Sequence, residues 1–218
     1  TTNPTVATTT PGSRCGTGTV VLSATASAGT LTWYDASSGG TLLGSLTSYT
    51  TPSISSTTTY YVDATDNGCT SISRTSILAA VNSIPSAPTG TSSQSFCSAN
   101  SPKVSDLSAT GTSIQWYNAS SGGSLFTNTT DLTNTTHYYA TQTISGCEST
   151  TRFDVTATIN TTPTISGTTP ASRNCSGSIT LAASASAGTV NWYNTSAGGS
   201  LLYSGTSYSI SSITQTTS

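Results

Sequence analysis

Charged residues are scarce in this chain, which has only five Lys and Arg, seven Asp and Glu and one His among its 218 residues. The formal net charge is -2 and the sequence has no basic patch, so nucleic acid is not an expected partner. Methionine is absent, also from position 1, and no signal-peptide pattern is found, which favours an internal or processed fragment. No apolar run approaches the roughly 20 residues that a membrane-spanning helix needs.

A sustained helical period is also missing from the sequence. Hydrophobic residues make up 33% of the chain, and most of the remainder is Ser, Thr, Gly and Asn. A disordered chain of such low hydrophobicity usually carries a high net charge, whereas low charge with many Thr and Val favours β-structure around a thin core. Val20, Leu22 and Ala24 alternate with polar residues, which is typical of a half-buried strand.

One segment occurs three times. WYDASSGGTLL at 33–43 returns as WYNASSGGSLF at 116–126 and as WYNTSAGGSLL at 192–202. A Cys precedes each copy, and the first two copies are followed by the related segments TTTYYVDATDNGC and NTTHYYATQTISGC. Repeats of about 80 residues, each with several short strands and turn signals, predict tandem domains with a small β-sandwich fold.

The repeat pattern predicts an all-β fold of tandem immunoglobulin-like domains at 1–84, 85–162 and 163–218. The third copy aligns with the first up to its end, where two strands and the second Cys are still to come. We therefore expect the third domain to be incomplete. A sandwich without these strands leaves a sheet edge and part of its core uncovered.

Aromatic residues mark the expected core of each domain. Immunoglobulin-type sandwiches have a Trp on the third strand and a Tyr two residues before a core position on the sixth. Trp33 and Tyr60 fit these positions in the first copy, Trp116 and Tyr138 in the second, and Trp192 in the third. These five residues are the predicted structural core.

The Tyr that follows each Trp is the candidate binding residue. Tyr34, Tyr117 and Tyr193 alternate with the inward-facing Trp, so they should point outward, where exposed rings can stack on sugars. The same segment is also typical of a hairpin, in which Gly39 and Gly40 supply the backbone freedom that the turn needs. Three copies of the segment favour three copies of a fold over three ligand sites.

The order of these motifs resembles that of immunoglobulin-like repeats in very long secreted and surface proteins of Bacteroidetes bacteria. Among such proteins are gliding-motility adhesins and proteins exported by the type IX secretion system. The resemblance covers essentially the whole chain and is weaker in the second copy. It implies a tandem stalk on an exported protein, and it identifies no ligand because such repeats occur in proteins of many activities.

The five cysteines allow several pairings. One bridge per domain, Cys15–Cys69 and Cys97–Cys147, places partners at opposite ends of a sandwich, well over 20 Å apart at about 3.3 Å per residue. A disulfide needs Cα atoms within about 7 Å. In a tandem array the two ends of neighbouring domains meet, so we favour an interdomain Cys15–Cys147 bond. Within-domain bridges and free thiols stay open, and Cys175 has no partner in this sequence.

The sequence offers no catalytic constellation. The single His, His137, has no repeated partner, and the acidic residues are scattered. Asp35 becomes Asn in the other copies, so a repeated carboxylate role is lost. Asp63 and Asp66 near a turn suit Ca²⁺ only weakly, since the second copy has Thr141 and Ile144 there. We therefore predict no catalytic residue, no metal and no cofactor.

These observations favour a structural role over a binding role. We expect a non-catalytic stalk or filament segment of a long extracellular adhesin or surface protein. Its partners would be neighbouring repeats of the same chain, with self-association into filaments. The alternative is an accessory module of a secreted enzyme that binds carbohydrate or another surface. A third option is a subunit whose incomplete third domain accepts a strand from another molecule.

Overall fold

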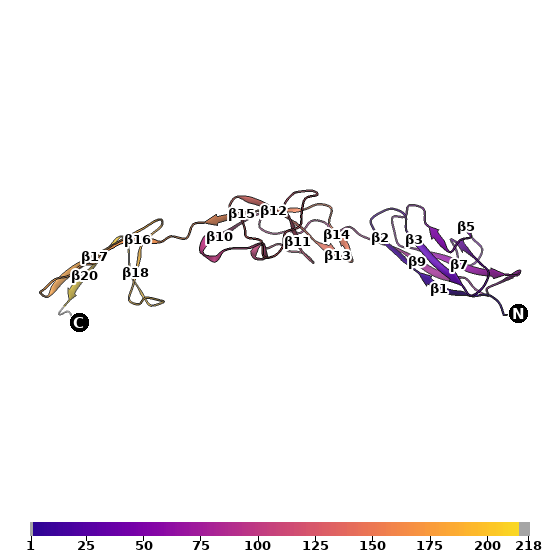
Figure 1. The fold of residues 1–218 in the computed structure, drawn as a ribbon, viewed down its shortest axis with the longest axis horizontal. Helices are drawn as coiled ribbons and strands as arrows, with labels where there is room; N and C mark the ends of the chain where they lie inside the picture. The colour runs from indigo at the N-terminus through magenta and orange to yellow at the C-terminus, as the bar shows by residue number, and fades with distance from the viewer. Residues whose placement is uncertain (1, 214–218) are drawn as a thin grey trace. The chain divides into compact units, whose positions relative to one another are not determined.

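The chain is all-β, and the computed structural model describes residues 2–213 of it (Figure 1). Residues 95–102 and 159–218 form one compact unit, and the rest of the first two repeats forms another. The domain boundaries expected from the sequence remain predictions. The end of the third copy, at 214–218, lies outside the described residues.

The first repeat is a two-layered sandwich. Its sheets have the strand orders β1-β3-β6 and β2-β9-β7-β4-β5, and the short β8 pairs with β7. The strands are β1 (Val6–Thr10), β2 (Gly12–Cys15), β3 (Val21–Ala26), β4 (Thr30–Tyr34), β5 (Leu42–Gly44), β6 (Ser48–Thr50), β7 (Thr58–Asp66), β8 (Cys69–Thr70) and β9 (Thr75–Asn82). All the pairings are antiparallel except that of β2 with β9, which is parallel. The first strand region therefore switches from one sheet to the other, as in immunoglobulin-type sandwiches.

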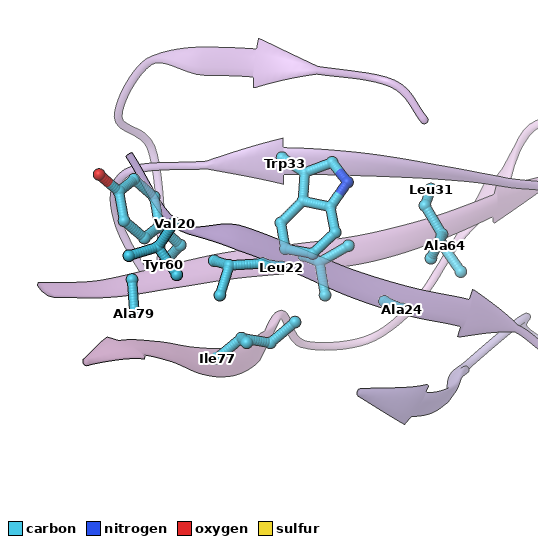
Figure 2. Close-up of a cluster of buried hydrophobic side chains, with 10 residues drawn as sticks. Val20, Leu22, Ala24, Leu31, Trp33, Tyr60, Ala64, Ile77 and Ala79 are labelled. Carbon is cyan, nitrogen blue, oxygen red and sulfur yellow. The ribbon is translucent and has the colours of Figure 1, made fainter. Parts of the chain in front are cut away.

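The core of this repeat lies around Trp33, whose side chain is fully buried between the two sheets (Figure 2). Its indole N–H donates a hydrogen bond to the Leu46 carbonyl at 2.6 Å, so the polar edge of the ring is satisfied inside the core. Tyr60 and Val62, both on β7, belong to the same buried cluster. The remaining buried hydrophobic residues of this cluster are Val20, Leu22, Ala24, Leu31, Ala64, Ile77 and Ala79.

The second repeat has one regular sheet with the strand order β10-β15-β12-β11. Its elements are β10 (Ser93–Cys97), η1 (Ser98–Asn100), η2 (Val104–Asp106), β11 (Gln115–Tyr117), β12 (Thr136–Thr141), β13 (Thr143–Ile144), β14 (Cys147–Glu148) and β15 (Phe153–Asn160). Trp116 and Tyr138 are buried. The Tyr138 hydroxyl accepts a hydrogen bond from the Thr133 N–H five positions upstream at 2.9 Å. This contact ties the start of β12 to the preceding turn.

The second repeat differs from the first where β3 would be expected. A single 3₁₀ turn, η2, stands there instead of a strand, although the sequence predicted β-structure throughout. Val104 and Leu107 are both buried, and a spacing of three places them on one side of a 3₁₀ turn. Lys103 is bonded through its backbone N–H to the Asp106 carboxylate at 2.8 Å, which closes the turn. The apolar contribution to the core is kept, but the backbone that delivers it is different.

The third repeat, described by itself, has two small sheets ordered β16-β17-β20 and β18-β19. Its strands are β16 (Ile165–Thr169), β17 (Gly177–Ala185), β18 (Asn191–Tyr193), β19 (Leu201–Ser204) and β20 (Ser207–Ile213). Within the described residues it has no counterpart of β7 or β9. Trp192 is therefore only half-buried, although its indole N–H still donates to the Gly205 carbonyl at 2.8 Å. Leu201, Leu202 and Tyr203 are exposed.

Candidate functional site

The joint between the first two repeats contains a disulfide bond. Cys15 is the last residue of β2 and Cys147 is the first residue of β14 in the next repeat. Their sulfur atoms are 2.04 Å apart and their Cα atoms 5.6 Å apart. Cys147 is fully buried and Cys15 is half-buried. The interdomain pairing favoured from strand geometry is the one that this structure contains.

Backbone and side-chain hydrogen bonds support this joint on both sides of the disulfide. The Asn82 carbonyl accepts from the Gly16 N–H at 2.9 Å, and the Asn82 amide group donates to the Ser145 carbonyl at 3.1 Å. Further along the linker, the Gln142 amide group donates to the Ser86 carbonyl at 2.9 Å. The segment after β9 is therefore held to the second repeat by these hydrogen bonds as well as by the peptide chain.

The within-repeat pairings are not formed. Cys69, Cys97 and Cys175 are free and exposed. Cys69 lies in a turn that matches the turn of Cys147: Asn67 and Gly68 have φ of 48° and 81°, and the equivalent residues Ser145 and Gly146 have 51° and 78°. Cys97 ends β10 as Cys15 ends β2. The free thiols thus occupy the same two positions as the bonded pair.

The outward tyrosines of the first two repeats are covered by arginine. The Arg74 guanidinium carbon lies 3.2 Å from the centre of the Tyr34 ring, and that of Arg152 lies 3.7 Å from the centre of the Tyr117 ring. Cation–π contacts of this kind hold a ring face against a charged partner. One face of each of these two rings is therefore occupied by a guanidinium group.

Each arginine also binds the turn that follows its tyrosine. Arg74 donates to the Ala36 and Gly39 carbonyls at 2.7 and 2.6 Å. Arg152 donates in the same way to the carbonyls of Ala119 and Gly122. One guanidinium group therefore fixes both the ring and the two backbone carbonyls of the polar loop, and we call this arrangement the arginine clamp.

The two clamps differ in their acidic neighbours. Arg74 forms an ion pair with Asp63 at 3.5 Å, and both side chains are largely buried, with 15% and 9% of their surfaces exposed. In the second repeat the Tyr117 hydroxyl instead donates to the Glu148 carboxylate at 2.9 Å. Burial of Tyr117, together with this hydrogen bond, raises the pKa of its phenol above its ordinary value. The same clamp is therefore built with different electrostatic partners.

Tyr193 in the third repeat has no such cover among the described residues and is 50% exposed. Arg74 and Arg152 each stand five positions after the second Cys of their repeat, on the segment that leads into the last strand. The described part of the third repeat contains no such strand. Tyr193 is thus the one outward tyrosine of the three that the structure leaves open within residues 2–213.

The first polar residue after each Trp-Tyr pair closes the loop in all three repeats. The side-chain oxygens of Asp35, Asn118 and Asn194 each accept a hydrogen bond from the backbone N–H six positions on, at 2.7, 2.8 and 2.9 Å. For Asp35 this bond from Thr41 lowers the pKa of the carboxyl group. The shared role is that of an acceptor oxygen, so Asp and Asn serve equally and no carboxylate chemistry is implied.

The remaining candidates for chemistry have structural partners. His137 is exposed and its Nδ1 lies 2.9 Å from an oxygen of Asp154 on the neighbouring strand. Asp63, considered for calcium, is engaged by Arg74. No group of three or more His, Cys, Asp or Glu residues suited to a metal ion occurs in residues 2–213. Over the same residues no helix is long and apolar enough to cross a membrane.

An all-β repeat that carries a Trp in each copy, with Trp33 fully buried between the two sheets of the first, defines a protein of tandem immunoglobulin-like β-sandwich domains. Residues 2–82, 85–160 and 161–218 each match the family described as "Ig-like domain CHU_C associated", and the chain belongs to this family. No curated protein matches the chain. The family assignment agrees with the all-β tandem fold expected from the sequence.

Solved structures with a similar fold are tandem immunoglobulin-domain proteins of low sequence identity. The I-band fragment I67–I69 of titin is 11% identical, with a TM-score of 0.39, and the match covers 98% of this chain and 89% of that one. Three N-terminal domains of the Highly Immunogenic Outer Capsid protein of bacteriophage RB49 are 12% identical, with a TM-score of 0.41 and coverages of 97% and 87%. Immunoglobulin domains 1–5 of Sidekick-1 are 14% identical, with a TM-score of 0.36 and coverages of 98% and 54%.

Sequence reasoning missed the two clamp arginines. Arg74 and Arg152 each stand five positions after the second Cys of their repeat, so their recurrence was visible. Arg14 and Arg173, which also recur, have a local role instead. Each donates from its Nη1 to the backbone carbonyl five positions on, at 3.1 and 2.9 Å. Both pairs of repeated arginines therefore hold turns.

Proposed function

We propose that this chain is a non-catalytic structural segment, a stalk or filament piece, of a long extracellular adhesin or surface protein. The observation that supports this most directly is the joint between the first two repeats, where the Cys15–Cys147 bond and the hydrogen bonds of Asn82 restrict motion between successive domains. A spacer needs a defined distance between its ends, and a bonded joint supplies it. The neighbouring repeats of the same chain are then the principal partners.

An extracellular location and a Bacteroidetes origin belong to the same proposal. Disulfide bonds persist in oxidising compartments and at cell surfaces. The low charge of the chain leaves solubility to surface hydroxyls, such as those of Thr8 and Thr25, which hydrogen-bond to each other at 2.6 Å across neighbouring strands. Such a surface suits a long filament, and it also permits self-association between filaments.

The test of this proposal is the stiffness of the first joint. Residual dipolar couplings measured on the full chain should fit a single alignment tensor for the first two repeats. In the C15S/C147S variant the two repeats should require different tensors. The C69S/C97S/C175S variant is the matched control and should keep the single tensor. Two independent tensors in the disulfide-bonded chain would contradict a stiff spacer.

A carbohydrate- or surface-binding accessory module of a secreted enzyme is the second candidate. The observation that favours it is the half-exposed ring of Tyr193, whereas Arg74 and Arg152 cover the equivalent rings. A glycan array probed with the full chain should then give signals that disappear in Y193A and persist in Y34A. Signals that are equal in both variants, or no signal at all, would leave only the structural role.

A further inference from the structure

The disulfide changes which residues a pulling force reaches. Cys15 and Cys147 are 132 positions apart, so 131 residues lie inside the covalent loop that the bond closes. Tension applied to the two ends of the chain follows the shortest covalent route, which passes through the bond. We propose that Cys15–Cys147 is a load-bearing bypass that shields residues 16–146 from extension. This inference rests on the proposed role as a spacer and adds to it a mechanical function of one bond.

The positions of the two cysteines relative to the strands make the shielded part large. Before the bond, the route contains β1 and β2, and Cys15 is the final residue of β2. After the bond it contains β14 and β15, since Cys147 begins β14. The strands β3 to β13 lie off the route. The buried Trp33, Trp116 and Tyr138 of both cores are therefore in the shielded part.

The bond also removes load from the contact between the second and last strands of the first repeat. β2 and β9 are parallel, with Gly12 opposite Ala79 and Cys15 opposite Asn82. Without the bond, tension enters at the start of β2 and leaves at the end of β9, so this ladder is sheared. With the bond, tension entering β2 leaves it at Cys15. The ladder and the linker after Asn82 then stay unloaded.

The spacing of the other cysteines fits a repetition of this bypass. Cys69 and Cys97 are 28 positions apart, and so are Cys147 and Cys175. Each of these segments runs from the turn after one strand, through the last strand of that repeat, into the next repeat. Where the same joint recurs, the end of each segment is bonded to the start of the segment after next, as Cys15 is bonded to the start of the 147–175 segment. Along this route load passes through every second segment, and the segment between, such as 69–97, lies with the domain cores in the bypassed part.

The experiment is single-molecule stretching of the full chain, held by handles at its two ends. The C69S/C97S/C175S variant serves as the reference because it keeps only the bonded pair. Only the first 15 and the last 72 residues can extend in this variant, to roughly 300 Å at about 3.5 Å per residue. Replacing Cys15 and Cys147 by Ser as well should release the whole chain and lengthen it by roughly 460 Å.

A second measurement covers the case in which the Ser variant does not fold. The reference variant is held stretched at constant force and a reductant is added, which should produce one step of roughly 460 Å as the bond is cleaved. Peptide mapping of the same sample establishes that Cys15 and Cys147 are linked before stretching. A linked sample that extends fully without reductant, or a mapped sample without this link, overturns the proposal. The stiffness of the joint, measured by dipolar couplings, is a separate readout and tests the spacer role independently.

Discussion

The guanidinium of Arg74 lies on the ring of Tyr34, with 3.2 Å between its central carbon and the ring centre. The two residues come from different strand regions, 40 positions apart, and the contact is repeated by Arg152 and Tyr117 in the next domain. A feature that recurs with the fold and covers the ring is part of the scaffold. The repeated Trp-Tyr segment is therefore explained in these two domains by the arginine clamp.

The clamp predicts unequal costs for removing its arginine. R74A leaves the largely buried Asp63 carboxylate without its ion-pair partner, so the free energy of unfolding of the first domain should fall by about 3 kcal/mol. R152A loses the ring contact and the two loop carbonyl bonds but leaves no such ion-pair partner. Its cost in the second domain should be about 1–2 kcal/mol. Urea denaturation of each variant, followed by domain-specific NMR signals, measures both values.

Lysine at position 74 tests how much of the effect of Arg74 comes from its charge and how much from the shape of its guanidinium group. R74K keeps the charge opposite Asp63 but lacks the planar fork that reaches the Ala36 and Gly39 carbonyls together. It should recover roughly half of the loss caused by R74A. Equal stability of R74K and the parent chain would show that the clamp geometry contributes nothing beyond charge.

The sequence predicted the repeated parts of this molecule better than its particular contacts. The buried Trp33 and Tyr60 were expected because immunoglobulin-type sandwiches place aromatic residues at fixed strand positions. The interdomain cysteine pairing was favoured over pairing within one repeat because the expected strand order places partners within a repeat too far apart. These inferences depend on the order of the strands, which the sequence pattern reveals.

The arginine clamp and η2 could not be derived in the same way. Arg74 meets Tyr34 only because β4 and β7 are neighbours and β9 follows, and the recurrence of an arginine after the second Cys does not reveal which ring it contacts. In the second repeat, Val104 and Leu107 fit a strand and a 3₁₀ turn about equally well in a short segment. Tertiary packing decides between them, and one sequence without its contacts does not contain that information.

The lowered pKa of Asp35 predicts a small contribution to the stability of the first domain that is lost in acid. Its folded pKa is lowered by the Thr41 N–H, so the stabilisation is present above the ordinary value near 4 and is lost as the pH falls through the folded value. D35N keeps the acceptor oxygen, as Asn118 and Asn194 do, and should match the parent chain at pH 7. The melting temperature of D35N should fall less than that of the parent between about pH 4.5 and 2.5. An identical acid profile for both chains would contradict this role.

The raised pKa of Tyr117 predicts that the second domain loses stability at alkaline pH. Its pKa is raised by burial and by the Glu148 hydrogen bond, so its stabilisation is complete below the ordinary phenol value near 10 and is lost as the pH rises through the folded value. Y117F removes the ionisable group. The stability difference between the parent chain and Y117F should therefore shrink above about pH 10. Guanidinium denaturation at pH 8, 10 and 11 measures the trend, and a difference that stays constant over this range would exclude it.

The two glycines of the loop should differ sharply when each is replaced by Asn, a residue that tolerates positive φ. Both have left-handed backbones, with φ of 60° at Gly39 and 72° at Gly40. A Cβ at Gly39 meets no atom within 4 Å, whereas one at Gly40 lies 2.3 Å from a carboxylate oxygen of Asp35. G39N should therefore cost less than about 1 kcal/mol. G40N should cost more, by about 1–3 kcal/mol of overpacking, because its Cβ crowds the Cβ of Ala36 at 2.8 Å and displaces Asp35 from the Thr41 N–H.

The same contrast is expected at Gly122 and Gly123, where the second position again faces the side-chain oxygen of the loop, here that of Asn118, at 2.3 Å. Thermal denaturation of the four single Asn variants compares the two domains directly. Because backbone strain is similar at both glycines of a pair, a large cost at the second position alone assigns the effect to the atoms that the new Cβ meets there, the acceptor oxygen and the Cβ of Ala36 or Ala119. Similar costs at both positions would mean that the turn conformation, and not the Asp or Asn acceptor, stabilises this loop.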